Sequence, residues 1–256
     1  MKQEQNIELK GGRAGKISKV KDQVCRPANL WTPTVHRFLK FLNDNGANFI
    51  PILHGIEDEK EFVSFIKGDV YNDPLPKIFK EDAMIVSAAK LLSKFHKLSE
   101  LYIGNIDTHS RWMLNPVHPI EVICHGDFAP YNTVIVDEKS TAMIDFDTIH
   151  PGPKIWDVSY ASYRWVSFID QGEEEFDENM RKIRLFLNTY GMLDKKKDLL
   201  MTLIERLQSL MGFMKSEAMA GNKDFQKNIE DGHLQKYTDD IDYLKKNERR
   251  MINAIK

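Results

Sequence analysis

Two polar segments near the middle of the chain carry residue types suited to binding a metal ion and moving a proton. The segment HGDFAPYN spans 125–132, and the segment IDFD spans 144–147. Between them, two apolar runs flank a polar turn at 137–140, a pattern that predicts a β-hairpin. Such a hairpin would bring Asn132 and Asp145 side by side, because each stands at one of its two ends.

The side chains gathered in this way match the requirements of phosphoryl transfer. An amide oxygen from Asn132 and a carboxylate from Asp145 are hard oxygen ligands, which Mg²⁺ prefers. Asp127 would project into the same space as a free carboxylate. Phosphoryl transfer needs a metal that clamps the phosphates and an aspartate that positions and deprotonates the attacking hydroxyl.

The same segments resemble the aminoglycoside phosphotransferase and choline kinase-like family, which is similar in fold to protein kinases. HGDxxxxN has the aspartate-to-asparagine spacing of the protein-kinase catalytic loop, and WDVSYA at 156–161 adds to the likeness. The resemblance implies that Asp127 is the catalytic base, and that Asn132 in the same loop holds Mg²⁺ together with Asp145. It also implies that His125 supports the catalytic loop and that Asp157 braces it. ATP or GTP would be the phosphoryl donor.

The composition indicates a folded globular protein and excludes several functional classes. Hydrophobic residues make up 42% of the 256 residues, an ordinary share for a globular chain. The net charge of −2, from 38 acidic and 36 basic residues, argues against a nucleic-acid-binding protein. No apolar run approaches the ~18–20 residues of a membrane span, and the chain starts without an apolar signal segment. We therefore expect a cytoplasmic protein, and nothing in the sequence implies a protein partner.

Hydrophobic periodicity predicts an α+β, two-lobed protein kinase-like fold. The first part reads as short strands at 7–9, 17–20, 23–26, 50–54 and 61–66, with one helix that starts near Thr32 and ends before Gly46. Helices are predicted at 83–98, 194–220 and 234–255. Lys67 and Gly68, with two prolines close behind, mark a boundary. We expect a nucleotide-binding N-terminal lobe at 1–66 and a helical C-terminal lobe at 67–256, which holds the catalytic loop and the substrate site.

Two stretches of the N-terminal lobe are candidate nucleotide contacts. Gly11, Gly12 and Gly15 could let backbone N–H groups approach phosphates, although a short glycine cluster is more often only a turn. The kinase-like resemblance implies that the purine binds the backbone after the last strand of this lobe. We place that contact within 64–66, at Ser64, Phe65 or Ile66.

One departure from the family concerns its usual ion pair between a lysine on the third strand and a glutamate on the following helix. Arg26 stands at the lysine position and His36 near the glutamate position. Arg26 could still contact phosphates, because a guanidinium makes forked hydrogen bonds to their oxygens. His36 cannot pair with it as a carboxylate would, and it is equally well explained as a partly exposed helix residue. The choice between ATP and GTP stays open.

The sequence says less about the acceptor, for which we expect a hydroxylated small molecule of aminoglycoside-like or amino-alcohol-like type. An acidic cluster within 173–178 could attract a cationic substrate, but a solvated helix face is the better explanation. Tyr160, Tyr163 and Trp165 could form an aromatic wall for a cation or belong to the core. Asp147 either contacts the metal or is simply a polar residue where the chain leaves the second strand of the hairpin.

Two other functions compete with the kinase interpretation. A catalytically inactive nucleotide-binding sensor of the same fold is supported by Arg26 and His36, and opposed by the intact Asp127, Asn132 and Asp145. A metal-dependent phosphohydrolase could use the aspartates of both polar segments. That function lacks the additional histidine ligands we would expect, and it gives the hairpin no purpose.

Overall fold

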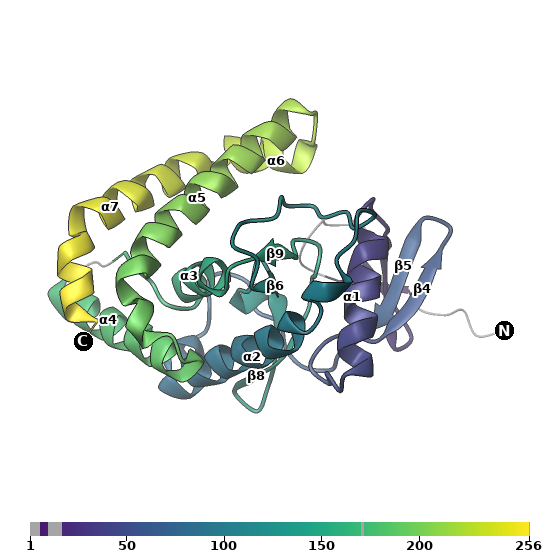
Figure 1. Cartoon of the computed structure of the whole chain (residues 1–256), viewed down its shortest axis with the longest axis horizontal. Coiled ribbons are helices and arrows are strands. Elements are labelled where there is room, and N and C mark those ends of the chain that lie inside the picture. The colour runs from purple at the N-terminus through teal and green to yellow at the C-terminus, as the bar shows by residue number, and fades with distance from the viewer. Residues whose placement is uncertain (1–5, 10–16, 170–171, 256) are drawn as a thin grey trace.

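The chain folds into a small part built on an antiparallel sheet and a larger, mainly helical part (Figure 1). The computed structural model describes residues 6–9, 17–169 and 172–255. This arrangement confirms the predicted α+β class with a strand-rich first part and a helical second part. The proposed phosphate contacts Gly11, Gly12 and Gly15 lie outside the described residues.

The N-terminal sheet has the strand order β1-β2-β3-β5-β4, with every neighbouring pair antiparallel. Helix α1 lies between β3 and β4 in the sequence and buries Val35, Phe38, Leu39 and Leu42. Pro33 suits its first turn, where a missing backbone N–H costs nothing. These elements are β1 (Asn6–Glu8), β2 (Ser18–Val20), β3 (Gln23–Pro27), α1 (Thr32–Asp44), β4 (Leu53–Glu57) and β5 (Lys60–Ser64).

The fourth strand starts three residues later than the sequence pattern predicts. Phe49 and Ile50 are buried in the core, so their hydrophobicity reflects tertiary packing rather than a sheet edge. Pro51 has no backbone N–H to donate to a neighbouring strand. Ile52 is held instead by two hydrogen bonds with Ser64, each 2.8 Å long. The backbone N–H of Ile52 donates to the Ser64 hydroxyl, and the backbone N–H of Ser64 donates to the Ile52 carbonyl.

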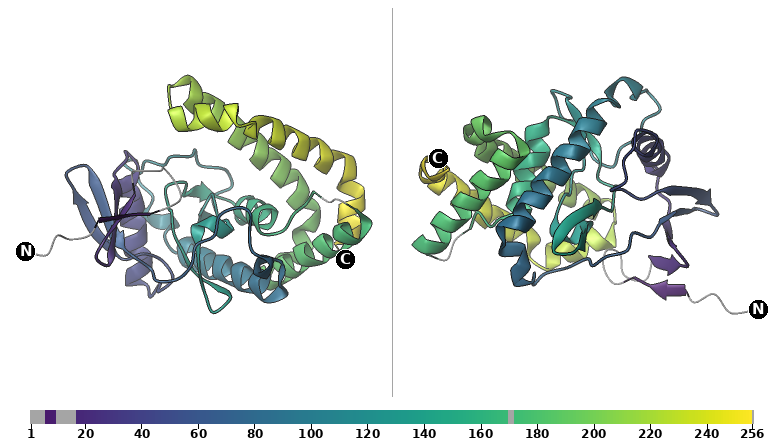
Figure 2. Two further views of the ribbon diagram at one scale, coloured as in Figure 1. Left: turned by 180° about the vertical axis from the view of Figure 1, so that it is seen from behind. Right: turned by 90° about the horizontal axis from the view of Figure 1, so that it is seen from below.

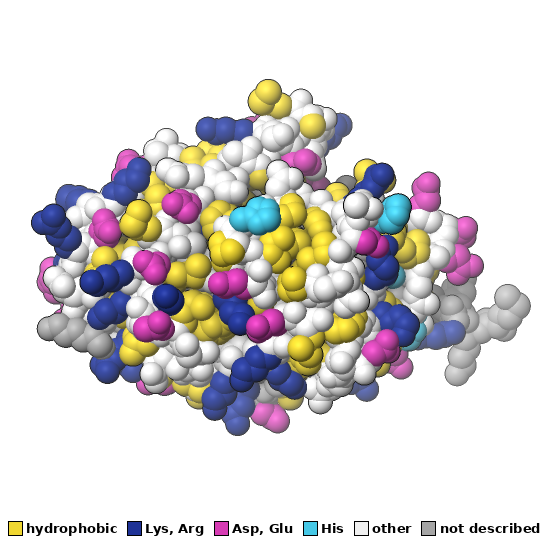
Figure 3. Space-filling view, viewed as in Figure 1, with side chains coloured by type: hydrophobic (Ala, Val, Ile, Leu, Met, Phe, Trp, Pro, Cys, Tyr) yellow, Lys and Arg dark blue, Asp and Glu magenta, His cyan; other side chains and the backbone are white. Residues whose placement is uncertain are grey.

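The helical part encloses two small two-stranded sheets, β6 with β9 and β7 with β8 (Figures 1 and 2). The β7–β8 pair is the hairpin that the sequence predicts. Both signs of charge are interspersed over this part on the face seen in Figure 3. The elements are α2 (Asp82–Glu100), β6 (Val122–Cys124), β7 (Thr133–Val136), β8 (Lys139–Met143), β9 (His150–Gly152), α3 (Lys154–Trp165), α4 (Glu173–Tyr190), α5 (Lys196–Met219), α6 (Lys223–Glu230) and α7 (His233–Ala254). No described helix is long and apolar enough to cross a membrane.

One continuous hydrophobic core joins the two parts beneath the polar segments. The ring of Phe38 on α1 packs edge-on against Phe95 on α2, at 5.9 Å between centroids. Phe95 in turn contacts His125 and Phe146, at 6.1 and 6.0 Å. All four of these side chains are almost fully buried. Burial of aromatic rings is among the larger stabilising contributions, so this core fixes the polar segments relative to α1.

The segment that follows β5 is fixed against the hairpin. Asp69 and Ile135 exchange two backbone hydrogen bonds of 3.0 and 2.8 Å. Gly68 has φ 146°, and a Cβ atom there would lie only 2.4 Å from the side chain of Val134. Only glycine therefore allows this close approach, which sets the distance between the sheet and the hairpin.

Candidate active site

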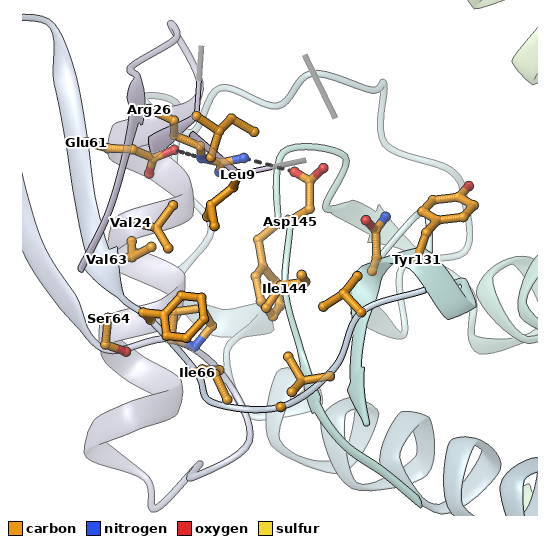
Figure 4. Close-up of a pocket in the computed structure, with 18 of the residues that line it drawn as sticks. Leu9, Val24, Arg26, Glu61, Val63, Ser64, Ile66, Tyr131, Ile144 and Asp145 are labelled. Carbon is orange, nitrogen blue, oxygen red and sulfur yellow. Dashed lines mark hydrogen bonds and ion pairs between the residues drawn. The ribbon is translucent and has the colours of Figure 1, made fainter. Parts of the chain in front are cut away.

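A cavity of about 510 Å³ lies between the N-terminal sheet and the β7–β8 hairpin (Figure 4). Its walls come from both parts of the chain, with Ser64 and Glu61 on one side and Asp145 and Tyr131 on the other. The cavity brings together most of the candidate residues that the sequence singles out, namely Arg26, Ser64, Phe65, Ile66, Asp127, Asn132 and Asp145.

The hairpin places the two candidate metal ligands at its open end. Ile144 donates its backbone N–H to the carbonyl of Asn132 at 3.0 Å, which ties the start of the hairpin to its end. The amide nitrogen of Asn132 donates to the Asp127 carboxylate at 2.9 Å and to its backbone carbonyl at 3.0 Å. These two bonds occupy the amide nitrogen, so the amide oxygen of Asn132 is the atom left for a cation.

Asp145 has an unusual backbone conformation, which directs its side chain into the cavity. Its φ is 60°, in the left-handed region that a non-glycine residue seldom adopts. The side chain is 44% exposed and points into the cavity, where it accepts a 3.0 Å hydrogen bond from Arg26. No group of three or more His, Cys, Asp or Glu residues in the described chain could hold a metal alone. One amide and one carboxylate fit Mg²⁺, which takes its remaining ligands from phosphates and water.

Asp127 is held beside the candidate metal ligands by two donors. The Tyr131 hydroxyl donates to one carboxylate oxygen at 2.8 Å, and the Asn132 amide donates to the other. Burial raises the pKa of Asp127 to about 6, against the opposing effects of the Tyr131 hydrogen bond and the positive charge of Arg164. The carboxylate is thus oriented and ionised near neutral pH. Tyr131 was not singled out from the sequence, although its position four residues after Asp127 is the signal for this contact.

His125 and Gly126 fix the backbone of the catalytic loop. The buried His125 ring accepts from the N–H of Asp127 at 3.4 Å and donates to the carbonyl of Ile144 at 3.2 Å. Burial lowers the pKa of His125, which favours this neutral form. Gly126 has φ 81°, and a Cβ atom there would lie 2.3 Å from the Thr148 carbonyl oxygen. The geometry therefore requires glycine at this position.

Asp157 on α3 lies beneath the loop and accepts three hydrogen bonds. The donors are the backbone N–H groups of His125 at 2.7 Å and Gly126 at 2.9 Å, and the His96 ring at 2.9 Å. Burial alone would raise the pKa of Asp157, but the His96 hydrogen bond and its positive field lower it to about 2. His96 also contacts the hydroxyl of Tyr190 at 2.6 Å, so it connects the loop to α4. Nothing in the sequence around His96 indicates this role.

We expect Asp157→Asn to destabilise the fold. An amide has one oxygen fewer and would turn an N–H group toward a donor, which leaves buried polar groups unpaired. The lowered pKa means that the wild-type stabilisation is complete at neutral pH. A loss of about 3 kcal/mol corresponds to a fall in Tm of roughly 6–12 °C for a chain of this length. Thermal unfolding measures the loss, with the exposed Asp82→Asn as a control expected to stay within about 1 kcal/mol. Equal Tm values for the two variants would contradict the bracing role.

Arg26 does have a glutamate partner, although His36 stands at the helix position where the family usually has its glutamate. Glu61, directly opposite Arg26 in the β3–β5 register, accepts a hydrogen bond from the Arg26 Nε atom. The Glu61 side chain is only 1% exposed, and its second oxygen contacts His36 Nε2 at 2.8 Å. His36 is therefore largely buried and binds the acid that holds Arg26. The carboxylate comes from a neighbouring strand rather than from the helix.

Asp147 completes the surroundings of Arg26. Its carboxylate accepts a 3.0 Å hydrogen bond from Arg26 Nη2, and burial raises its pKa. This contact with an arginine is a third role for Asp147, beside the metal contact and the strand end that the sequence suggests. Burial would lower the pKa of Arg26, but Asp147, Asp145 and Glu61 together raise it. Arg26 therefore stays protonated on the wall of the cavity.

We expect Arg26→Ala to weaken nucleotide binding about tenfold or more, the scale of a lost charge-assisted phosphate contact. Without this guanidinium, the carboxylates of Glu61, Asp145 and Asp147 would face the incoming phosphates uncompensated. Titration with nucleotide tests this, with the exposed Arg249→Ala as a control for the loss of one positive charge. An unchanged Kd for Arg26→Ala would mean that another cation holds the phosphates.

Several of the remaining candidate groups for substrate binding make contacts within the fold. Glu173 pairs with Arg250, and Glu178 with Arg181 and Lys182, as expected of a solvated helix face on α4. Tyr160 and Trp165 are buried, and Trp165 donates its indole N–H to the carbonyl of Phe128 at 3.2 Å. Trp165 therefore supports the loop at Phe128.

Comparisons with known proteins agree with the fold and with the polar segments. The model of the phosphotransferase enzyme family (APH) matches residues 97–186, which include HGDFAPYN, the hairpin and WDVSYA. A choline/ethanolamine kinase family protein from Mesorhizobium loti superposes with a TM-score of 0.64 at 12% identity, covering 98% of this chain and 92% of that one. Choline kinase from Cryptosporidium parvum superposes with a TM-score of 0.59 at 11% identity, covering 98% of this chain and 90% of that one.

A third solved structure is the aminoglycoside phosphotransferase APH(2'')-IIa in a ternary complex with streptomycin and ATP. It gives a TM-score of 0.54 at 13% identity, covering 86% of this chain and 90% of that one. No curated protein matches the sequence. The resemblance seen in HGDFAPYN and IDFD is thereby confirmed: over residues 97–186 the chain matches the phosphotransferase enzyme family, and it has the kinase-like fold of choline kinases and aminoglycoside phosphotransferases.

Proposed function

We propose that the protein transfers the γ-phosphoryl group of a nucleoside triphosphate, ATP in the first instance, to a hydroxyl of a small molecule. The observation that carries this proposal is that Arg26, Asp127, Asn132 and Asp145 all line the same cavity. A cation for phosphates, two metal ligands and a separate oriented carboxylate are the components of phosphoryl transfer.

The metal proposed for this site is Mg²⁺, held by the Asn132 amide oxygen and the Asp145 carboxylate. When bound, Mg²⁺ would neutralise phosphate charge. Arg26, restrained by Glu61, supplies a fixed positive charge on the same wall. The left-handed backbone at Asp145 aims its carboxylate into the cavity without help from the metal.

Asp127 is proposed as the catalytic base. Its carboxylate is oriented by Tyr131 and Asn132 rather than by a cation, so it is available to accept a hydrogen bond from a substrate hydroxyl. A general base works best when its pKa lies near the operating pH. Burial moves the pKa of Asp127 to about 6, closer to that condition than an exposed aspartate would be.

The purine is proposed to bind the backbone of Ile66. Ser64 and Phe65 also line the cavity, but their backbone N–H groups already donate to Ile52 and Asp22, each at 2.8 Å. The polar backbone groups of Ile66 make no hydrogen bond within the described chain. A base edge can use these groups without breaking the sheet. Apolar side chains around it, among them Val24 and Ile144, suit a flat ring.

Acceptor-dependent turnover tests this proposal. The protein is incubated with Mg-ATP or Mg-GTP and a set of hydroxylated metabolites, amino alcohols and aminoglycosides, and nucleoside diphosphate is measured. Diphosphate formed only with acceptor supports the kinase. Nucleotide binding without turnover of any acceptor would support the inactive sensor, whose main argument was the missing acidic partner for Arg26. Glu61 supplies that partner, so we favour the enzyme.

A further inference from the structure

The guanidinium of Arg164 packs on the ring of Tyr131, whose hydroxyl contacts the proposed catalytic base Asp127. Arg164, near the end of α3, places its guanidinium carbon 5.2 Å from the ring centroid of Tyr131 and 6.0 Å from that of Tyr163. The Tyr131 hydroxyl is the group that donates to Asp127 at 2.8 Å. Arg164 is thus positioned against the catalytic loop from the side of the helical part.

Arg164 has no acidic partner within the described chain. No carboxylate of the described residues forms an ion pair with it, although its charge acts to lower the pKa of Asp127, and its Nε–H is buried without a hydrogen-bond acceptor. Arg26, by contrast, contacts three carboxylates. Arg206 on α5 repeats the pattern: it donates to the Gly126 carbonyl at 2.7 Å and stacks on Tyr160, but its own Nε–H is also buried and unpaired.

The nearby acids are engaged with other groups. Asp127 accepts from Tyr131 and Asn132, and Asp240 on α7 accepts from the Tyr163 hydroxyl at 2.5 Å. Ring faces stabilise a guanidinium by a fraction of what a counter-ion supplies, and they leave the Nε–H of Arg164 without an acceptor. Buried donors without acceptors are uncommon and costly. An anion from outside the chain would supply the missing counter-charge of Arg164, and it would bind the two terminal NH₂ groups, because the Nε atom is buried.

This anion is not the nucleotide. Arg164 is absent from the residues that line the cavity with Arg26, Ser64 and Asp145. Tyr131 stands at the edge of that cavity away from Ser64 and Glu61, as Figure 4 shows, and Arg164 packs on the Tyr131 ring. The nucleotide and metal therefore occupy one side of Asp127, and Arg164 serves the other side, where the acceptor hydroxyl must approach.

We propose that the phosphoryl acceptor carries an anionic group, a carboxylate or a phosphate ester, and that Arg164 binds this group while Asp127 orients the hydroxyl. The planar fork of arginine matches both anions. This inference rests on the proposed kinase function and names its substrate class. It differs from the cationic choline-like or aminoglycoside-like acceptor that the sequence suggests, because Arg164 would repel a cation at the reacting hydroxyl.

Turnover with a chosen set of acceptors tests the substrate class. Hydroxy acids and sugar phosphates are compared with choline, ethanolamine and an aminoglycoside at fixed Mg-ATP. We expect turnover only with anionic acceptors. Arg164→Gln should raise the KM for anionic acceptors tenfold or more and leave kcat within a few-fold of the wild type. Arg164→Lys should recover part of the lost acceptor affinity. The exposed Arg184→Gln on α4 should change neither KM nor kcat. Preferred turnover of a cationic acceptor with an unchanged KM in Arg164→Gln would overturn the inference and leave the kinase intact. A fall in kcat at unchanged acceptor KM would assign Arg164 to the transferred phosphoryl group and also overturn it.

A binding measurement separates failure of the inference from failure of the kinase function. Inorganic phosphate and malonate are titrated into protein saturated with Mg-ADP, which fills the nucleotide side. We expect binding of one or both anions by the wild type and a tenfold or greater weakening in Arg164→Gln but not in Arg184→Gln. The stronger of the two anions identifies the acceptor as a phosphate ester or a carboxylate. Binding that is absent, or equal in wild type and Arg164→Gln, would refute the anion site whether or not any acceptor turns over.

Discussion

Asp127→Asn should lower kcat about a hundredfold or more while nucleotide Kd changes by no more than a few-fold. The loss has the size of general-base catalysis, since the substitution removes the only proton acceptor proposed at the reacting hydroxyl. Binding should survive because the proposal assigns the phosphates and the metal to Arg26, Asn132 and Asp145, and neither of them to Asp127. Single-turnover kinetics and equilibrium nucleotide titration measure the two quantities separately.

A matched control distinguishes the base from the hydrogen-bond network around it. Tyr131→Phe removes the 2.8 Å bond to the Asp127 carboxylate but keeps the carboxylate itself. We expect that variant to lose much less activity than Asp127→Asn. Parallel losses in kcat and nucleotide affinity for Asp127→Asn would make Asp127 a metal ligand instead. No loss in either would reduce HGDFAPYN to a structural turn.

The parts of this site that the sequence predicted are those whose geometry is local. Asn132 and Asp145 meet because a tight hairpin joins them, and the lengths of its strands and turn are visible in the sequence. The hydrogen bond from Asn132 to Asp127 likewise spans only five residues. Short-range spacing of this kind leaves little freedom once the strands form.

The contacts that the sequence did not reveal join distant segments. Glu61 is 35 residues from Arg26, and their contact depends on the register of β3 against β5. Register is set by the burial of a whole sheet face, so no single residue indicates it. His96 reaches Asp157 across 61 residues because α2 packs beneath the loop. The Nε–H of Arg164 lacks an acceptor in the described chain, and a missing acceptor becomes visible only when all neighbours are placed.

The Arg26 surroundings show that one charge arrangement can be built from different elements. A buried carboxylate must be paired to be stable, and Glu61 finds both Arg26 and His36. Because His36 belongs to α1, the position of this helix is coupled to the orientation of Arg26. The same coupling would follow from a glutamate on the helix itself. The chain thus reaches a restrained cation at the cavity wall by a route that crosses the sheet.

Asp145→Ala should abolish Mg²⁺-dependent nucleotide turnover while the fold survives. Asp145 is the only carboxylate proposed as a metal ligand, and the Asn132 amide alone is a weak site for a divalent cation. The fold should survive because the Asp145 side chain is 44% exposed and Arg26 keeps Glu61 and Asp147 as partners. Turnover, Mg²⁺-dependent tightening of nucleotide binding, and Tm are the three measurements.

Two further variants separate the metal role of Asp145 from its structural surroundings. Asp145→Asn keeps the size and tolerates the left-handed backbone at φ 60°, so it tests the charge without the strain that alanine introduces. Asp147→Ala removes a carboxylate that contacts the same arginine through the same type of bond. If Asp145 binds the metal, Asp145→Asn loses the Mg²⁺ dependence of nucleotide binding and Asp147→Ala keeps it. Near wild-type turnover in Asp145→Ala would show that the hairpin does not assemble a metal site, because the Asp145 carboxylate would then be dispensable.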